Sequence, residues 1–217
     1  MASIPSSDKH HQPYFFLSYA RTPRISANDP NPNLWVTKFY RALCQEIMQI
    51  SRPPDGVSPG FMDQELRVGA AWNERLTKEL ATCRVFVPLY SPRYFANEPC
   101  GKEWAAFDLR RKQLMEQGAD FPEVVLPVFW VPVRPDDLPE MAHPIQFHDP
   151  ALGAQYQERG VYGLIKLHRC SDHCKSVVAA LARRIVDLAE NVRLPPGKPC
   201  DFTSLKSAFV PDWGRRF

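Results

Sequence analysis

The sequence predicts an α/β fold in which helices cover both faces of a parallel β-sheet. Short runs that are apolar on both faces alternate along the chain with amphipathic helical patterns, which is typical of parallel strands joined by crossover helices. The 217 residues are 44% hydrophobic and 24% charged, which suits one globular domain with a substantial core. Ligands of such sheets bind at the carboxyl ends of the strands.

The first strand and the first helix have the clearest patterns. Residues 14–18 are expected to form a central strand, because the run Tyr-Phe-Phe-Leu is apolar on both faces. A loop rich in Pro, Asn and Asp follows over 22–33. Apolar pairs then recur every four residues over 34–50, which predicts a helix with Asn33 as its N-cap.

The middle of the chain repeats this alternation. We expect a short strand near 58–62, a loop over 63–69 and a helix over 70–82 with apolar residues on one side. The apolar run at 84–90 predicts the third strand, and 91–99 is expected to be a loop.

The last third is less regular. A charge-rich helix is expected over 101–117, a fourth strand over 124–130 and a short fifth strand over 144–147. Residues 148–170 carry no clear pattern, whereas 171–191 has the apolar periodicity of a helix.

These elements place one domain at residues 13–191. Residues 1–12 are polar and expected to be mobile. Residues 192–217 have three prolines near their start and no periodicity, which favours a C-terminal tail or linker.

The charge distribution argues against a nucleic-acid-binding domain. The chain has 27 Lys and Arg against 24 Asp and Glu, a net charge of +3, and the excess lies in residues 191–217. The neutral body lacks the basic face that nucleic acid requires.

The longest apolar run, 124–133, is about half as long as a membrane span, and the N-terminus has no apolar signal segment. We therefore expect a cytoplasmic protein without a membrane partner.

Cysteine and motif patterns exclude several further classes. The six cysteines are expected to be reduced thiols, as is usual in the cytosol. Cys170 and Cys174 lie one helical turn apart, but common zinc sites pair two such knuckles, so a helix start with half-buried thiols is favoured over a metal site. The sequence has no G-x-G-x-x-G, Walker A or H-E-x-x-H motif, which argues against a Rossmann dehydrogenase and a P-loop NTPase.

Three segments, in this order, resemble the TIR (Toll/interleukin-1 receptor) domain family. Residues 14–19 resemble the opening strand motif, and residues 61–72 resemble the second motif with a glycine before the next helix. Residues 91–104 resemble the third motif: Cys100-x-x-Glu103 matches the family pattern Trp-Cys-x-x-Glu, with Pro99 in place of the tryptophan. The opening segment is also similar to a bacterial, FxsC-like TIR group.

The resemblance implies a flavodoxin-like three-layer sandwich with about five parallel strands. It also implies one of two functions. Many bacterial and plant TIR domains cleave NAD⁺ at the nicotinamide–ribose bond, often in defence against phage, whereas others are interaction modules without activity. NAD⁺ would be the substrate, with no cofactor, and other TIR domains would be the protein partners.

The resemblance implies that Glu103 is the catalytic carboxylate. Nicotinamide leaves NAD⁺ as a neutral amine, so one carboxylate beside the developing oxocarbenium ion can suffice. The positive end of the helix dipole is expected to keep Glu103 ionised. The alternative is a glutamate in a first helical turn that helps capping.

The resemblance also implies residues that bind the substrate. Arg21 could meet the pyrophosphate or be an exposed loop arginine, and Trp72 or Tyr94 could stack on a base, although core positions are more common for both. The full set is Ser18, Tyr19, Arg21, Trp72, Ser91, Tyr94 and Cys100.

In the family, the loop after the second strand both gates the pocket and makes TIR–TIR contacts. That loop contains Asp63, Arg67 and Gly69, and the alternative is a simple strand-to-helix connection with Gly69 as its turn residue. We expect an open, shallow pocket that a second copy would cover.

Two functions therefore stand side by side: an NAD⁺ glycohydrolase activated by self-association, and a non-catalytic TIR adaptor. Glu103 favours the enzyme, and Pro99 departs from the family pattern beside it. A nucleoside deoxyribosyltransferase-like enzyme is a third hypothesis, but it requires further carboxylates at strand ends, which the sequence does not place.

Overall fold

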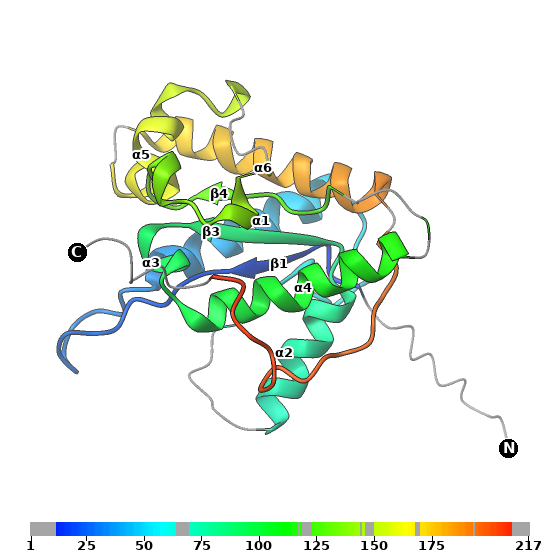
Figure 1. The fold of residues 1–217 in the computed structure, drawn as a ribbon. Helices are drawn as coiled ribbons and strands as arrows, with labels where there is room; N and C mark the ends of the chain where they lie inside the picture. Colours follow the sequence, from blue (N-terminus) through cyan, green and yellow to red (C-terminus); the bar gives the residue numbers. More distant parts are fainter. Residues whose placement is uncertain are drawn as a thin grey trace, which may run out of the picture.

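The structure, a computed structural model, has a four-stranded parallel sheet between two layers of helices (Figure 1). The strand order among the described residues is β2-β1-β3-β4. The predicted fold class is confirmed, with four strands in the described part of the chain where about five were expected. The residues that the structure describes are 12–63, 70–116, 118, 123–143, 145, 150–167, 170–192 and 194–209.

The central strands are the most apolar part of the chain. Every residue of β1 (Phe15–Ser18) and of β3 (Val85–Tyr90) is buried, and β1 pairs with both β3 and the edge strand β2 (Gly60–Met62). β4 (Val128–Phe129) is shorter than predicted. Residues 124–126 already bond to Phe86, but Pro127 follows and has no N–H to donate to the ladder.

The helices form the two outer layers. On one face, α1 (Leu34–Ile50) packs against α6 (Ser171–Asn191), and on the other α2 (Ala70–Thr82) packs against α4 (Glu98–Glu116) (Figure 1). The predicted bounds of α1, α2 and α6 are confirmed. One detail is wrong: the Asn33 side chain does not cap α1, because it exchanges hydrogen bonds with the backbone of Thr22 and so ties down the preceding loop.

The structure contains elements that the sequence did not predict. The region 91–99 is not only a loop, because it includes the short helix α3 (Pro92–Phe95). α5 (Ala154–Lys166) packs against β4 and α6, and its pattern is interrupted by a kink at Gly160. Short 3₁₀ turns lie at Pro135–Asp137 (η1), Glu140–Ala142 (η2) and Pro150–Leu152 (η3). The fifth strand expected at 144–147 falls mostly outside the described residues.

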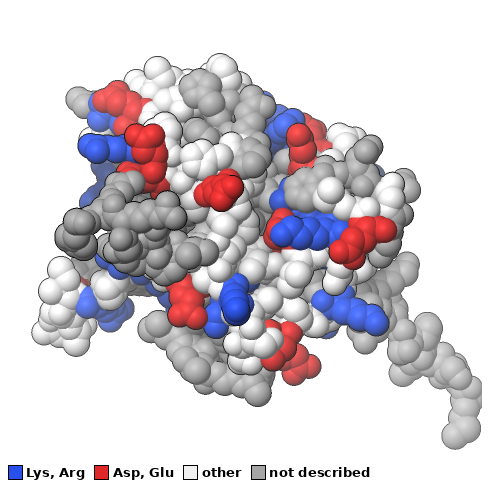
Figure 2. Space-filling model, in the orientation of Figure 1, with Lys and Arg blue, Asp and Glu red and all other residues white. Residues whose placement is uncertain are grey.

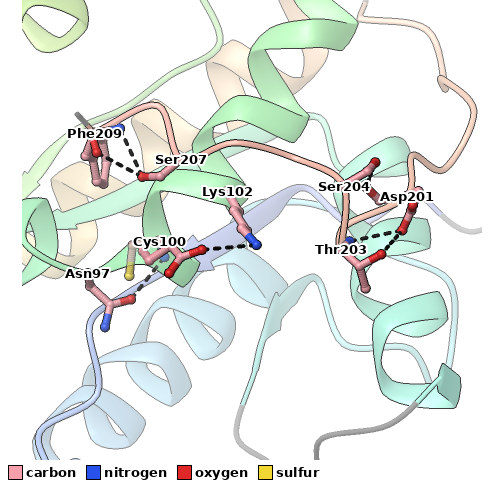
Figure 3. Close-up of polar contacts among 9 residues, drawn as sticks. Asn97, Cys100, Lys102, Asp201, Thr203, Ser204, Ser207 and Phe209 are labelled. Atoms are coloured by element: carbon pink, nitrogen blue, oxygen red, sulfur yellow. Dashed lines mark hydrogen bonds and ion pairs between the residues drawn. The ribbon is translucent and has the colours of Figure 1, made fainter. Parts of the chain in front are cut away.

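Part of the C-terminal tail packs against the domain. Residues 194–209, which we name the C-terminal strap, run along α2 and α4 (Figure 1). The buried guanidinium of Arg110 donates to the carbonyl oxygens of Leu194 (2.9 Å) and Pro195 (2.8 Å). At the other end, the Ala208 N–H donates to Gly101 O at 3.0 Å, and Phe209 is buried beside the start of α4 (Figure 3). The strap thus joins the end of α2 to the first turn of α4.

The surface mixes both signs of charge. Figure 2 shows Lys and Arg interspersed with Asp and Glu over the face that it draws. All six cysteines are free. Within the described residues, no helix combines the length and hydrophobicity needed to cross a membrane, and the same residues hold no group of three or more His, Cys, Asp or Glu side chains suited to a metal ion.

Candidate functional site

Glu103 lies in the second turn of α4 and reaches the carboxyl end of β1. Its carboxyl group is buried, with the residue 8% exposed, and the hydroxyl of Ser18, the last residue of β1, donates to Oε2 at 2.5 Å. The helix start that carries it is fixed by Asn97, whose Oδ1 accepts from the Cys100 N–H at 3.0 Å (Figure 3). The site therefore sits at the sheet edge where ligands of parallel sheets bind.

Burial raises the pKa of Glu103 to about 8. The hydrogen bond from Ser18 and the charge of Arg21 oppose this rise, whereas the charge of Asp63 adds to it. The expectation that the helix dipole keeps Glu103 ionised is therefore wrong. The dipole effect fades beyond the first turn and contributes about 0.3–1 kcal/mol, less than the cost of burying a carboxylate.

Tyr94 lies beside Ser18, inside the core. Its hydroxyl oxygen is 2.9 Å from Ser18 Oγ, and the side chain is fully buried, so in this structure its ring offers no face to a base. Ser91 determines where Tyr94 lies, because its Oγ caps α3 by accepting from the Tyr94 N–H at 3.0 Å. Ser91 thus acts through the backbone in this structure.

Cys100 is buried one helical turn before Glu103. Burial, with a smaller contribution from the neighbouring Glu103, raises the pKa of its thiol well above the ordinary value. A neutral, buried thiol is a packing group and not a nucleophile.

Three polar residues tie the ends of β1 and β2 together. Arg21 Nη2 donates to Asp63 Oδ2 at 2.7 Å and to the Asp63 carbonyl at 3.1 Å. Tyr19 donates its hydroxyl to the same carbonyl at 3.1 Å. Arg21 is consequently a half-buried, paired arginine, and not an exposed loop residue.

The structure brings most of the predicted site residues to one edge of the sheet. Arg67 and Gly69 lie outside the described residues, and for Trp72 only its place in the first turn of α2 is described, not its side chain. The expectation of an open, shallow pocket is wrong around Glu103, which is buried in this conformation. The residues that gather here are Ser18, Tyr19, Arg21, Asp63, Tyr94, Cys100 and Glu103.

Sequence reasoning missed one residue of this region. Phe209 of the strap packs its ring 5.4 Å from that of Tyr94 and 5.8 Å from that of Trp104. The available signal was a small apolar run, Ala-Phe-Val at 208–210, in an otherwise polar tail.

One serine lies in a hydrolase-like motif but not on the strand-to-helix turn that such a nucleophile requires. Residues 56–60 read Gly-Val-Ser-Pro-Gly, the G-x-S-x-G spacing of hydrolase nucleophiles. Ser58, however, precedes β2 instead of following a strand, and its Oγ donates to Gly60 O at 2.9 Å. It stabilises the entry to β2.

One of three comparisons with known proteins identifies the family of the chain. No curated protein matches the chain. Among solved structures, it is similar to the TIR domains in a structure of the activated Roq1 resistosome directly recognizing the pathogen effector XopQ, with 17% sequence identity and a TM-score of 0.33 over 82% of this chain and 95% of that chain. The TIR domain family itself matches residues 15–160, which is more than half of the sequence. The chain belongs to the TIR domain family.

Proposed function

We propose that this TIR domain cleaves NAD⁺ at the bond between nicotinamide and ribose, with Glu103 as the catalytic carboxylate. The observation that carries the proposal is a carboxyl group buried at the carboxyl edge of a parallel sheet, with Ser18 donating to it and with a pKa raised to about 8. Perturbed carboxyl groups at such positions are characteristic of functional sites.

The chemistry requires one well-placed negative charge. The bond between ribose C1′ and the pyridinium nitrogen breaks, its electron pair leaves with neutral nicotinamide, and C1′ becomes an oxocarbenium centre that water captures. An ionised Glu103 beside C1′ stabilises this cation. With a pKa of about 8, about one tenth of the groups are ionised at pH 7, and the cationic pyridinium of the substrate favours the ionised form.

We further place the chain among bacterial signalling or anti-phage effectors of the FxsC-like TIR group, which associate with other TIR domains. The opening segment at residues 14–23 supports the subgroup, and the TIR family match over residues 15–160 supports association with other TIR domains.

To test this proposal, purified protein at high concentration is incubated with NAD⁺, and the nicotinamide released from NAD⁺ is measured by chromatography. Glu103→Gln keeps the volume and removes the charge, so we expect the rate to fall about a hundred- to a thousandfold. Glu98→Gln is the matched control, because Glu98 lies on the same helix, 70% exposed and paired with Lys102. Equal rates for wild type and Glu103→Gln would exclude the assignment.

A non-catalytic adaptor is the second candidate function. The burial of Tyr94 and Cys100 favours it, because neither side chain is exposed to a substrate in this structure. The adaptor hypothesis predicts no nicotinamide release at any protein concentration, with binding to a second TIR domain retained.

A further inference from the structure

Three buried groups from three elements form a continuous hydrogen-bonded chain. The Tyr94 hydroxyl of α3 lies 2.9 Å from Ser18 Oγ at the end of β1, and Ser18 Oγ lies 2.5 Å from Glu103 Oε2 on α4. The hydrogen bonds run from Tyr94 to Ser18 and from Ser18 to Glu103, so the hydrogen-bonding effect of Tyr94 on the carboxyl group passes through Ser18.

The number of available protons gives this chain a direction. An ionised carboxylate can only accept, so Ser18 must give its single proton to Glu103. Ser18 Oγ can then only accept from Tyr94, which makes Tyr94 the donor at the far end. When Glu103 is protonated, it can itself donate to Ser18, and the Tyr94 proton is no longer required. The hydroxyl of Tyr94 therefore serves the ionised state in particular.

Aromatic packing fixes the direction of the Tyr94 hydroxyl. The buried ring contacts Tyr90 (6.2 Å between centroids), Phe95 (5.4 Å) and Phe209 (5.4 Å). Phe209 is itself 4% exposed and belongs to the C-terminal strap. Ser91 holds the backbone of Tyr94 through the cap of α3. The C-terminal strap thus reaches the groups around Glu103 through one ring.

We propose that Tyr94 is a positioning residue for Glu103, that its hydroxyl orients Ser18 toward the ionised carboxylate, and that Phe209 of the strap holds Tyr94 in place. This inference rests on the proposed function for its catalytic meaning. The charged and titratable groups that also face Glu103 are Arg21 after β1, Asp63 after β2, Tyr19, and Cys100 on its own helix. The variants below leave all four unchanged.

The first experiment measures the Glu103 carboxyl directly and needs no activity. The full chain is labelled with ¹³C at glutamate carboxyls and titrated by NMR, with Glu103→Gln identifying the signal. Tyr94→Phe keeps the ring and removes the hydrogen-bond donor, so the titration midpoint of the Glu103 carboxyl should rise by about 0.5 to 1 pH unit.

Tyr90→Phe is the matched control. Tyr90 is a buried tyrosine of the same aromatic cluster, and its hydroxyl has no hydrogen-bond partner in the described part of the chain. Its removal should leave the Glu103 midpoint unchanged. A midpoint in Tyr94→Phe equal to that of wild type, or an equal rise in Tyr90→Phe, would overturn the proposal.

Turnover supplies the catalytic readout. In Tyr94→Phe the pH profile of kcat should shift to higher pH by the same amount as the Glu103 midpoint. KM should stay unchanged, because Tyr94 is buried and is not exposed to a substrate in this structure. A change in KM without a shift of the profile would contradict a positioning role. A shifted titration in a protein that releases no nicotinamide would contradict the proposed function alone.

A double-mutant cycle tests the role of Phe209. If Phe209 holds Tyr94, then Tyr94→Phe should shift the Glu103 midpoint less in a Phe209→Ala background than in wild type. Phe209→Leu serves the same purpose with a smaller loss of packing. Equal shifts in both backgrounds would remove the strap from the assignment.

Discussion

The Glu103 carboxyl should make the stability of the protein depend on pH. Its pKa rises from 4.5 to about 8 on folding. The contribution of Glu103 to the free energy of unfolding is therefore complete below pH 4.5 and is lost as the pH rises to about 8. The total loss is at most about 5 kcal/mol.

Glu103→Gln removes this titration. By urea unfolding, the variant should match wild type near pH 5 and exceed it in the free energy of unfolding near pH 9. Parallel pH dependences for the two proteins would show that Glu103 does not have its pKa raised in the folded protein.

At the residue scale, the sequence predicted which residues gather but not how they interact. The family motif identified Glu103, and the end of the first strand identified Ser18, since strand ends follow from the apolar run. The prediction that Glu103 is ionised was wrong, because its protonation depends on burial by segments that are distant in sequence. Its position in a helix does not reveal that burial. For Arg21 the sequence left open a role at the pyrophosphate and an exposed loop position, and it did not predict the ion pair with Asp63, which lies 42 residues away.

At the element scale, the contact between the strap and α4 gives a prediction at Gly101. A Cβ there would lie 1.8 Å from Ser207 Oγ and 3.1 Å from Phe209. Alanine normally stabilises a helix relative to glycine, by about 1 kcal/mol. Here we expect Gly101→Ala to destabilise the protein by about 1–3 kcal/mol, because the strap must move.

Ser207→Ala tests the cause of this destabilisation. Removal of the hydroxyl relieves the closest contact, so adding Ser207→Ala to Gly101→Ala should recover part of the loss, measured by urea unfolding. If Gly101→Ala alone is more stable than wild type, the strap does not pack on α4 as described.

The elements that the sequence predicted well are those with a local pattern. The periodicity of α1, α2 and α6 gave their bounds, because each has a long amphipathic stretch. The strap has no such pattern, because it contains no described helix or strand. Its backbone is held by hydrogen bonds to Arg110, which lies 84 and 85 residues before its partners, and to Gly101. α5 was missed because Gly160 interrupts its repeat.

At the scale of the whole molecule, the buried site bears on assembly. Glu103 is 8% exposed, so a dinucleotide can reach it only after a rearrangement, and the population of that open state limits activity. A second copy that stabilises the open state would raise activity. Specific activity should therefore increase with protein concentration, and Arg67→Glu, in the loop implied in TIR–TIR contacts, should reduce the increase. Constant specific activity from nanomolar to high micromolar protein would show that a monomer suffices.

The most direct test of Glu103 as the catalytic group is the pH dependence of kcat/KM for nicotinamide release from NAD⁺. This parameter reports the ionisations of the free protein, in which Glu103 is buried and has a pKa of about 8. The rate should therefore rise with pH through one ionisation near 8, because only the ionised carboxylate stabilises the oxocarbenium ion. The residual rate of Glu103→Gln should not show this ionisation. No release at any pH, or a Glu103→Gln variant with the rate and pH profile of wild type, would contradict the claim that Glu103 drives NAD⁺ cleavage.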